Sequence, residues 1–429
     1  MATKVNPGLN ELDELCIQTI RFLSLDAVQK AKSGHPGMPM GMASAAYTLW
    51  MKYLRHNPTS PKWLGRDRFV LSAGHGSMLL YSLLYLTGYD VSLDDLKNFR
   101  QWGSKTPGHP EFGHTAGVEA TTGPLGQGLG NAVGMALAQK YLSAYFDKDG
   151  SNLFDYNIFT IAGDGCLQEG VSSEACSLAG HLGLSKLIVI YDDNHISIDG
   201  NTSLSFSEDR AKRFEAYNWY VQVVGGDGND MVSFEKALKN AIAEKDRPSI
   251  INFRTHIGYG SPNFQDTHTA HGAPLGEDEI KLIKKDFGWD PEKTFVVPDE
   301  VLKHTRTIQE KGAKLEKEWD AKFEKYAKQY PDLAKLIKNP EPKITELPTF
   351  PAEPMSTRAA SGKTLDMLMP NMPLVLGGSA DLTPSNNTRY KGVEDFQKDN
   401  PTGRYIRYGV REHGMAAIMN GIAASELLR

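Results

Sequence analysis

Cysteine, long apolar runs and net charge are all scarce in this sequence of 429 residues. Its three cysteines, Cys16, Cys166 and Cys176, are too few and too irregularly spaced to predict a disulfide scaffold or a zinc site, so we expect reduced thiols in a cytoplasmic protein. No uncharged apolar run approaches the roughly 18 residues that a membrane helix needs. The net charge of −5 gives no electrostatic reason to expect binding to nucleic acid or to an anionic membrane.

The N-terminal residues also lack the apolar core of a signal sequence. Glu11, Asp13 and Glu14 come early in the chain, so neither secretion nor import into an organelle is expected. The remaining composition, with 40% apolar and 23% charged residues, is ordinary for a soluble globular protein. A chain of this length is long enough for two or three domains.

Short β-branched runs alternate with helical patterns over most of the chain. Strands are predicted at 68–72, 157–162, 186–191, 220–224 and 249–254, and helices at 11–32, 131–146 and 233–244. Such alternation predicts an α/β fold with a doubly wound, mostly parallel sheet.

The composition changes near residue 299, where a stretch dense in Lys and Glu begins. Five prolines then follow closely, namely Pro340, Pro342, Pro348, Pro351 and Pro354. We interpret residues 1–325 as a first domain, 326–353 as a linker and 354–429 as the beginning of a second, incomplete α/β domain.

In that last segment, strands are predicted at 374–376 and 405–408, and a helix from about Gly414. One strand–helix–strand unit with a final helix is too small to be stable alone. We therefore expect the segment after Pro354 to be poorly ordered or domain-swapped in solution.

Polar residues follow two of the predicted strands, at the point where each strand ends. Gly163-Asp164-Gly165 closes one apolar run, Asn194 follows the next, and the 28 residues between them, 166–193, include a predicted helix. Because the carboxyl ends of parallel strands meet at one edge of the sheet, Asp164 and Asn194 are expected to lie close together. A carboxylate and an amide oxygen there suit Mg²⁺ that keeps phosphate oxygens among its ligands.

A glycine-rich stretch, residues 121–130, runs into the helix predicted near Asn131. Glycines before a helix N-terminus expose backbone N–H groups to an anion. A tight loop that needs positive φ angles explains the glycines equally well. The presence of Asp164 and Asn194 in the same sequence favours a phosphate site.

A second Gly-Asp-Gly sequence, residues 226–228, also follows a predicted strand. No Asn lies at the matching distance, since Asn252 is too near and Asn263 too far. Because a helix begins near Ser233, we interpret Asp227 or Asp230 as a turn or capping residue and assign no metal to this sequence.

Several histidines lie beside glycine and proline in predicted loops rather than on apolar faces. They are His35, His75, His109, His268 and His271. A lone histidine is more often a surface or core residue, but this group is harder to dismiss, and no pair has the spacing of a zinc site. Hydrogen bonding to a polyhydroxylated substrate, or transfer of its protons, fits the pattern better.

Two further candidates follow strands of the last segment. Asp381 lies in Ser379-Ala380-Asp381-Leu382, and Glu412 lies in Arg411-Glu412-His413-Gly414 at a helix start. Glu412 is explained as simply by the helix dipole. Arg358 and Ser385 are candidates for contact with a phosphate ester, although each taken singly is typical of an ordinary surface residue.

The motifs together resemble the transketolase family of thiamine-diphosphate enzymes, from about Glu11 to Ala424. The matching segments are SGHPGMPMG, SAGHG, TPGHPE, TTGPLGQG, IAGDGCLQEG, YDDNHISIDG, THTAHGAPLG, GGSADLTPSN and VREHG. The spacing of Gly163-Asp164-Gly165 and Asn194 is similar to the general thiamine-diphosphate signature.

The resemblance implies thiamine diphosphate and Mg²⁺ or Ca²⁺ as cofactors. Asp164, Asn194 and the carbonyl group of Ile196 match the metal ligands. The positions that match cofactor contacts are His75, Gly123, Leu125, Gly165, Glu169, Asn194, His268, Asp381 and Glu412. The positions that match sugar-phosphate contacts are His35, His109, His268, Arg358 and Ser385. Glu412, His35, His109 and His268 are the implied catalytic residues.

The implied reaction is the transfer of a two-carbon glycolaldehyde unit from a ketose phosphate to an aldose phosphate, as in the pentose phosphate pathway. Xylulose 5-phosphate, ribose 5-phosphate and erythrose 4-phosphate are the expected substrates. The resemblance also implies a homodimer whose active sites form between subunits, with the diphosphate domain of one facing the pyrimidine domain of the other.

The family continues beyond residue 429, through the rest of a pyrimidine-binding domain and a further C-terminal domain. We therefore expect this chain to be truncated within the pyrimidine-binding domain. Two hypotheses follow: a transketolase, or a catalytically incompetent isoform or fragment that binds Mg²⁺ and diphosphate or associates with full-length subunits. A dihydroxyacetone synthase or a deoxyxylulose-phosphate synthase is a weaker third possibility.

Overall fold

The computed structural model describes residues 6–226, 228–341, 344 and 346–429. Its centre is a five-stranded parallel sheet of order β1-β2-β3-β7-β6. The strands are β1 (Arg68–Leu71), β2 (Ile158–Gly163), β3 (Leu187–Asp193), β6 (Tyr220–Val224) and β7 (Ser249–Arg254). The predicted α/β fold with a mostly parallel sheet is confirmed.

The central strands form because their β-branched side chains are buried on both faces of the sheet. All residues of β2 except Gly163, and all of β3 except Asp193, are buried. Helix α7 (Gly170–Leu182) connects β2 to β3, and it packs against α5 (Gln127–Phe146). This crossover brings the ends of β2 and β3, and thus Asp164 and Asn194, to one edge of the sheet.

The helices of the N-terminal segment pack mainly against one another. Helix α1 (Glu11–Ala31) begins with a capping box between Asn10 and Asp13 and ends at Lys32, whose φ of 51° is left-handed. The other elements here are α2 (Gly37–Thr48), a π-helical turn (Leu49–Tyr53), the 3₁₀ turn Gly74–Gly76, α3 (Ser77–Thr87) and α4 (Leu93–Lys97). No helix among the described residues is both long and apolar enough to span a membrane.

Short elements follow the strands that carry the candidate residues. They are α6 (Asp164–Gln168), β4 (Ile196–Ser197), β5 (Gly200–Asn201), the 3₁₀ turn Thr202–Leu204, α8 (Arg210–Ala216), α9 (Met231–Ala243), α10 (Thr269–Gly272) and α11 (Glu277–Asp286). The side chain of Asp230 caps α9 by accepting a hydrogen bond from the Ser233 amide, as the capping interpretation predicts. Asp227 lies outside the described residues.

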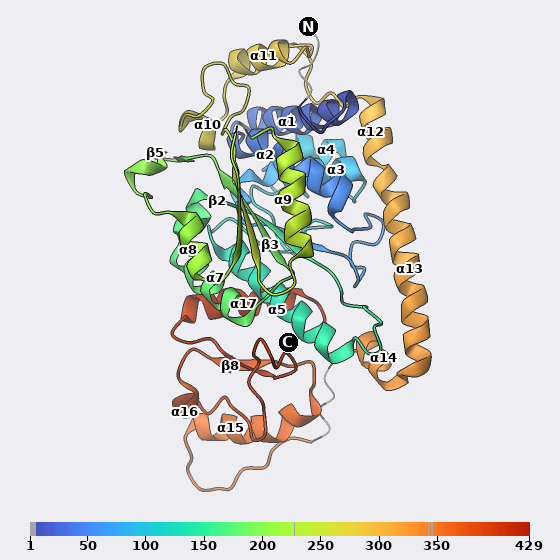
Figure 1. Cartoon of the computed structure of the whole chain (residues 1–429), viewed down its shortest axis with the longest axis vertical. Coiled ribbons are helices and arrows are strands. Elements are labelled where there is room, and N and C mark those ends of the chain that lie inside the picture. The colour runs from blue at the N-terminus through green and yellow to red at the C-terminus, as the bar shows by residue number, and fades with distance from the viewer. Residues whose placement is uncertain (1–5, 227, 342–343, 345) are drawn as a thin grey trace.

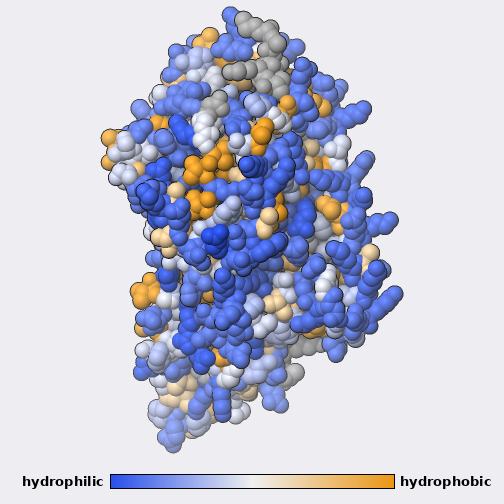
Figure 2. Space-filling model, in the orientation of Figure 1, coloured by the Kyte–Doolittle hydropathy of each residue, from blue (hydrophilic) through white to orange (hydrophobic). Residues whose placement is uncertain are grey.

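The outer surface near the sheet edge is mostly polar. Figure 2 shows this face of the molecule as largely hydrophilic, with apolar atoms gathered in a small patch beside α9. Strand β6 is an edge strand, and its Val223 is exposed, as is Val232 of α9.

Three helices run down one side of the molecule toward the second unit (Figure 1). They are α12 (Asp299–Thr305), α13 (Thr307–Gln329) and α14 (Pro331–Lys338). The predicted linker, residues 326–353, thus contains the end of α13 and the whole of α14. Residues 342, 343 and 345 of that linker lie outside the described residues.

The second unit contains a small parallel sheet of β8 (Gly377–Ser379) and β9 (Tyr405–Arg407). Its helical elements are α15 (Thr357–Leu368), a 3₁₀ turn (Met369–Asn371), α16 (Thr383–Asn386) and α17 (Glu412–Ala424). The strand predicted at 374–376 is displaced by three residues. There, the backbone groups of Leu374 and Leu376 pair instead with Arg429, through N–O distances of 3.0 and 2.8 Å.

The second unit shares its core with the first. Helix α17 lies on α5 at the junction seen in Figure 1, and glycines let the two backbones meet. A Cβ atom on Gly421 would lie 1.9 Å from the Asn131 carbonyl oxygen, and one on Gly134 would lie 2.0 Å from that of Ile418. This shared core argues against uniform disorder after Pro354, and hydrogen exchange in solution is the direct test.

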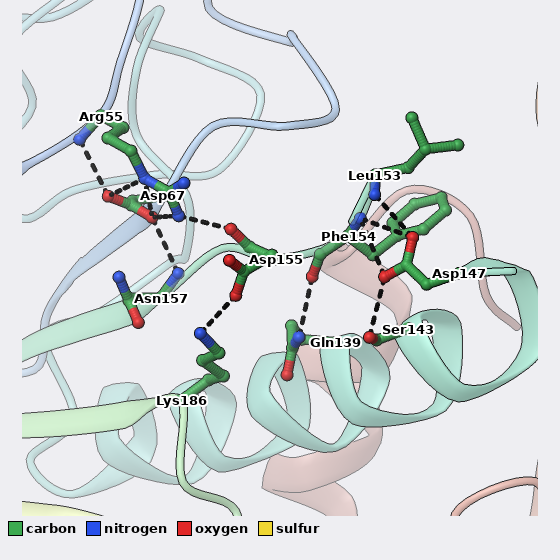
Figure 3. Close-up of polar contacts among 10 residues, drawn as sticks. All are labelled: Arg55, Asp67, Gln139, Ser143, Asp147, Leu153, Phe154, Asp155, Asn157 and Lys186. Atoms are coloured by element: carbon green, nitrogen blue, oxygen red, sulfur yellow. Dashed lines mark hydrogen bonds and ion pairs between the residues drawn. The ribbon is translucent and has the colours of Figure 1, made fainter. Parts of the chain in front are cut away.

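The amino ends of β1 and β2 carry a network of satisfied polar groups (Figure 3). Asp67 accepts hydrogen bonds from the Arg55 guanidinium and the Arg55 amide at 2.8 and 2.9 Å, and from the Asn157 amide at 2.8 Å. Nearby, Asp155 pairs with Lys186. This end of the sheet is therefore closed by ion pairs within the chain.

Candidate functional site

A cavity of about 650 Å³ lies at the carboxyl ends of β2 and β3. It gathers residues from segments that are far apart in the sequence. The lining includes His35, His75, His109, Gly123, Leu125, Asp164, Gly165, Asn194, Ile196 and His271. Nine of these match site residues that the family resemblance implies, and His271 is one of the loop histidines singled out in the sequence.

Asp164 begins α6 and is 3% exposed. The Tyr191 hydroxyl donates a hydrogen bond to Asp164 Oδ1, whereas Oδ2 has no partner among the described residues. A buried carboxylate oxygen without a donor is costly, so Oδ2 is a ready ligand for a cation.

Asn194 is oriented by its neighbours. Its Nδ2 donates to Asp192 Oδ2 at 2.9 Å, and its Oδ1 accepts from the Ile196 amide at 3.0 Å. The Asn194 oxygen is thereby turned toward the turn that follows β3, where the Ile196 carbonyl group lies. No cluster of three or more His, Cys, Asp or Glu side chains suited to a metal was found in the described part of the chain. Asp164, Asn194 and Ile196 therefore form a mixed oxygen set that needs ligand oxygens to complete it.

Burial disfavours the charged forms of two carboxylates around this point. Burial raises the pKa of Asp164 to about 7, and the nearby Asp193 and Asp192 add to the rise, against the hydrogen bond from Tyr191. Burial likewise raises the pKa of Asp192 to about 6. A divalent cation would favour the ionised forms, so the residues present fit a metal.

The glycine-rich segment forms a tight loop that also lines the cavity. Gly123 and Gly126 have φ angles of 142° and 79°, and α5 begins at Gln127, four residues before the predicted start. A Cβ atom on Gly128 would lie 2.6 Å from Ser72 Cα. Both interpretations of these glycines therefore apply: the turn needs them, and it places the start of α5 beside the cavity.

Four imidazole rings cluster in the lining of the cavity. The His35 centroid lies 5.2, 5.7 and 6.3 Å from those of His75, His271 and His109. Burial lowers the pKa of all four rings, to about 4 for His35, and neighbouring rings lower those of His35 and His75 further. At neutral pH each ring is therefore uncharged and offers one donor and one acceptor.

The structure does not bring His268 into the cavity. His268 is exposed and precedes α10, whereas His271, one turn later, stacks on His75 with centroids 5.0 Å apart. The buried Nδ1 of His271 has no partner among the described residues. The two histidines are three residues apart, and the short helix α10 turns His271 toward the cavity and leaves His268 outside it. The sequence motif alone does not show which of the two rings faces the cavity.

The predicted site residues of the second unit also lie outside the cavity lining. Arg358 Nη1 donates to the Ser385 carbonyl oxygen at 3.4 Å, and both residues are exposed. Asp381, with a φ of 61°, lines a separate hollow of about 930 Å³ between α7 and the second unit. Glu412 is exposed at the start of α17, and Glu169 is exposed just before α7.

The start of α17 is nevertheless held firmly against the first unit. Glu174 Oε2 accepts a hydrogen bond from the Gly414 amide at 2.6 Å, and Arg411 Nη2 donates to Ser177 Oγ at 3.1 Å. Glu412 is therefore presented outward from a well-anchored helix end, away from the cavity of its own chain.

Comparisons with known proteins agree with this geometry. Residues 12–343 match the model of the transketolase thiamine diphosphate binding domain, and residues 353–429 match that of the transketolase pyrimidine binding domain. The Geobacillus stearothermophilus transketolase is 53% identical over 423 residues, covering 96% of this chain. Transketolase 1 of Saccharomyces cerevisiae is 52% identical over 428 residues, also covering 96%.

Solved structures agree as well. A Pichia stipitis transketolase in complex with sedoheptulose-7-phosphate superposes with a TM-score of 0.94 at 46% identity, covering 97% of this chain and 63% of the other. The Campylobacter jejuni transketolase gives a TM-score of 0.92 at 45% identity, covering 98% and 64%.

This chain spans 63% of the G. stearothermophilus enzyme and 62% of the S. cerevisiae enzyme. Both matched domains, and the cavity that the first of them builds, lead to one conclusion: the chain belongs to the transketolase family.

Proposed function

We propose that this chain binds thiamine diphosphate through a divalent cation, and that it supports ketol transfer between sugar phosphates. The observation that carries the proposal is the unpartnered, buried Oδ2 of Asp164 in a cavity shared with Asn194 and four neutral imidazoles. When bound, thiamine diphosphate supplies a nucleophilic carbon and an electron sink for cleavage of a carbon–carbon bond.

Asp164, Asn194 and the Ile196 carbonyl would hold Mg²⁺ or Ca²⁺, with diphosphate oxygens completing the shell. The loop at Gly123 and the start of α5 would receive the diphosphate, because they present backbone N–H groups. Leu125 packs against the backbone at Gly165, where a Cβ atom would lie 2.7 Å from its side chain, and both residues line the cavity.

The imidazole cluster would bind the sugar. His35, His75, His109 and His271 are neutral, so each ring has one N–H group that can donate a hydrogen bond to a substrate oxygen. Such donors also stabilise negative charge that develops on an oxygen during carbon–carbon cleavage. Xylulose 5-phosphate, ribose 5-phosphate and erythrose 4-phosphate are the proposed substrates. The P. stipitis structures in complex with sedoheptulose-7-phosphate and fructose-6-phosphate support this substrate class.

Glu412 would hydrogen-bond the aminopyrimidine ring and help remove the proton of the reactive carbon. Because Glu412 is exposed and lies outside the cavity of its own chain, a second copy has to supply it. Asp381, Arg358 and Ser385 lie outside the cavity on the same unit, which supports a homodimer with sites between subunits. A cytoplasmic location in the pentose phosphate pathway is part of the proposal, supported by three free, buried cysteines.

A second function, cofactor binding without turnover, is favoured by the separation of Glu412 from the cavity within one chain. A coupled assay with xylulose 5-phosphate and ribose 5-phosphate, on protein of confirmed intact mass, separates the two. Formation of sedoheptulose 7-phosphate that is lost in Glu412→Gln supports ketol transfer. Cofactor binding with no product above a protein-free blank supports the second function.

A further inference from the structure

Arg100 contacts His35, a residue that lines the cavity, and has an unusual backbone conformation. Its φ is 61°, which costs a residue with a side chain about 1 kcal/mol, and its amide donates to the Thr106 carbonyl oxygen at 3.0 Å. Thr106 is fully buried and holds this turn. The left-handed turn directs the Arg100 side chain back toward the loop that carries His35.

The Arg100 guanidinium contacts that loop at two points. Nη1 donates to Ser33 Oγ at 2.8 Å, and Nη2 donates to His35 Nδ1 at 3.4 Å. Gly34, between the two partners, has a φ of 140°, so the loop turns sharply where the guanidinium holds it. Arg100 therefore restrains both the loop and the ring.

The contact with Nδ1 determines where the hydrogen of His35 sits. A guanidinium has five N–H donors, no acceptor and a permanent charge. Nδ1 of His35 therefore has to accept, which places the single ring hydrogen of the neutral imidazole on Nε2. Burial and the charge of Arg100 both disfavour a second proton, in keeping with a His35 pKa of about 4.

The Nε2 side of the ring is open. Among the described residues, no hydrogen bond to His35 Nε2 is found, and His35 lines the cavity. A Cβ atom on Gly272 would lie 3.2 Å from Nε2, so glycine at that position keeps the ring edge clear.

We propose that Arg100 is a positioning residue that holds His35 as the Nε2–H tautomer, so that His35 donates a hydrogen bond into the cavity and does not accept one. On the proposed function, the acceptor is an oxygen of the sugar phosphate, such as the ketose carbonyl. The ring would thus favour a carbonyl or developing alkoxide oxygen at that point over a group that only donates.

The test is the tautomer of His35 in the free protein, read by nitrogen NMR of histidine-labelled chain and assigned with His35→Gln. We expect an unprotonated Nδ1 and a protonated Nε2 between pH 6 and 8. In Arg100→Met, we expect a mixture of tautomers and a rise of about one unit in the His35 pKa. His75, His109 and His271, the other titratable groups that face His35, are unchanged in every variant.

Two further variants sharpen the result. Arg100→Lys keeps a cationic donor and is expected to restore part of the wild-type tautomer population. Lys105→Met removes a charge from the same loop, where Lys105 pairs with exposed Asp90, and is expected to leave His35 unchanged.

A hydrogen on Nδ1 in the wild-type chain would overturn the proposal, even if Arg100→Met failed to fold. An unchanged tautomer and pKa in folded Arg100→Met would also overturn it. Because the free protein is measured, these outcomes are independent of turnover: a correct tautomer without ketol transfer would reject the proposed function alone.

Discussion

The buried carboxylates at the two ends of the parallel sheet differ in whether their oxygens have hydrogen-bond partners. At the amino end, Asp67 is fully buried, and both its oxygens accept hydrogen bonds from Arg55 and the Asn157 amide (Figure 3). At the carboxyl end, Asp164 is as deeply buried, but its Oδ2 has no partner among the described residues. Hydrogen bonds within the chain thus satisfy the carboxylate at the amino end, whereas the carboxylate at the carboxyl end has an oxygen that a ligand can use.

The titration of the two ends shows the same contrast. Burial would raise the pKa of Asp155, but the hydrogen bond and charge of Lys186 outweigh it, and the pKa lies below its usual range. At the other end, burial raises the pKa of Asp164 to about 7, and the hydrogen bond from Tyr191 and the charge of Arg210 offset only part of that rise. A buried carboxyl group in a cavity whose pKa is strongly raised marks a candidate functional site.

The largest expected effect on stability comes from removing the Asp67 carboxylate at the amino end of the sheet. Asp67→Ala leaves Arg55 and the Asn157 amide without their acceptor, so we expect a loss of about 3 kcal/mol in the free energy of unfolding. Urea denaturation of the variant measures the change. Asp90→Ala, at an exposed ion pair with Lys105, is the matched control, and we expect it to change stability by less than about 0.5 kcal/mol.

An opposite sign is expected at the carboxyl end. Asp164→Asn keeps an acceptor for Tyr191 but removes the buried charge, so the free energy of unfolding of the metal-free chain is expected to rise by about 2 kcal/mol at pH 8. The folded pKa of about 7 lies above the unfolded value of 3.8, so the cost of ionising Asp164 grows as pH rises between these values.

The gain from Asp164→Asn should therefore be small at pH 4 and constant above pH 8, as melting curves across this range would show. A destabilised Asp164→Asn at pH 8 would contradict the contrast between the two ends.

The smallest effect concerns acid stability at the amino end. The lowered pKa of Asp155 contributes stability above its unfolded pKa of 3.8, and that contribution is lost as pH falls through the folded value. Asp155→Asn should thus lower the melting temperature slightly at pH 7 and leave it unchanged at pH values below the folded pKa, which flattens the acid limb of the stability profile. Because Asp155 is half exposed, the shift is expected to be slight, and a large change at pH 7 would show that the ion pair matters more than its exposure suggests.

Much of this contrast is predictable from the sequence. Asp164 and Asn194 each follow a buried β-branched run, and the carboxyl ends of neighbouring parallel strands have to meet. The residues of the amino end, such as Asp67 and Asp155, carry no comparable signal, because their partners come from distant, irregular segments.

Other features of the fold and the site depend on tertiary contacts and could not be predicted from the sequence. Strand β8 falls on Gly377–Ser379 because the apolar residues before it pair with Arg429 instead. His271 rather than His268 faces the cavity because α10 turns between them. Arg100 gave no signal in the sequence, since its role depends on a left-handed turn that places it beside His35.

The central claim is that the carboxyl end of the sheet is a cation-dependent diphosphate site. Calorimetric titration of thiamine diphosphate with and without Mg²⁺ tests it, on the wild-type chain, on Asp164→Ala and on Asp67→Asn as a control from the other end. We predict binding that requires Mg²⁺, is abolished in Asp164→Ala and is retained in folded Asp67→Asn. Unchanged thiamine-diphosphate affinity in Asp164→Ala would contradict the account.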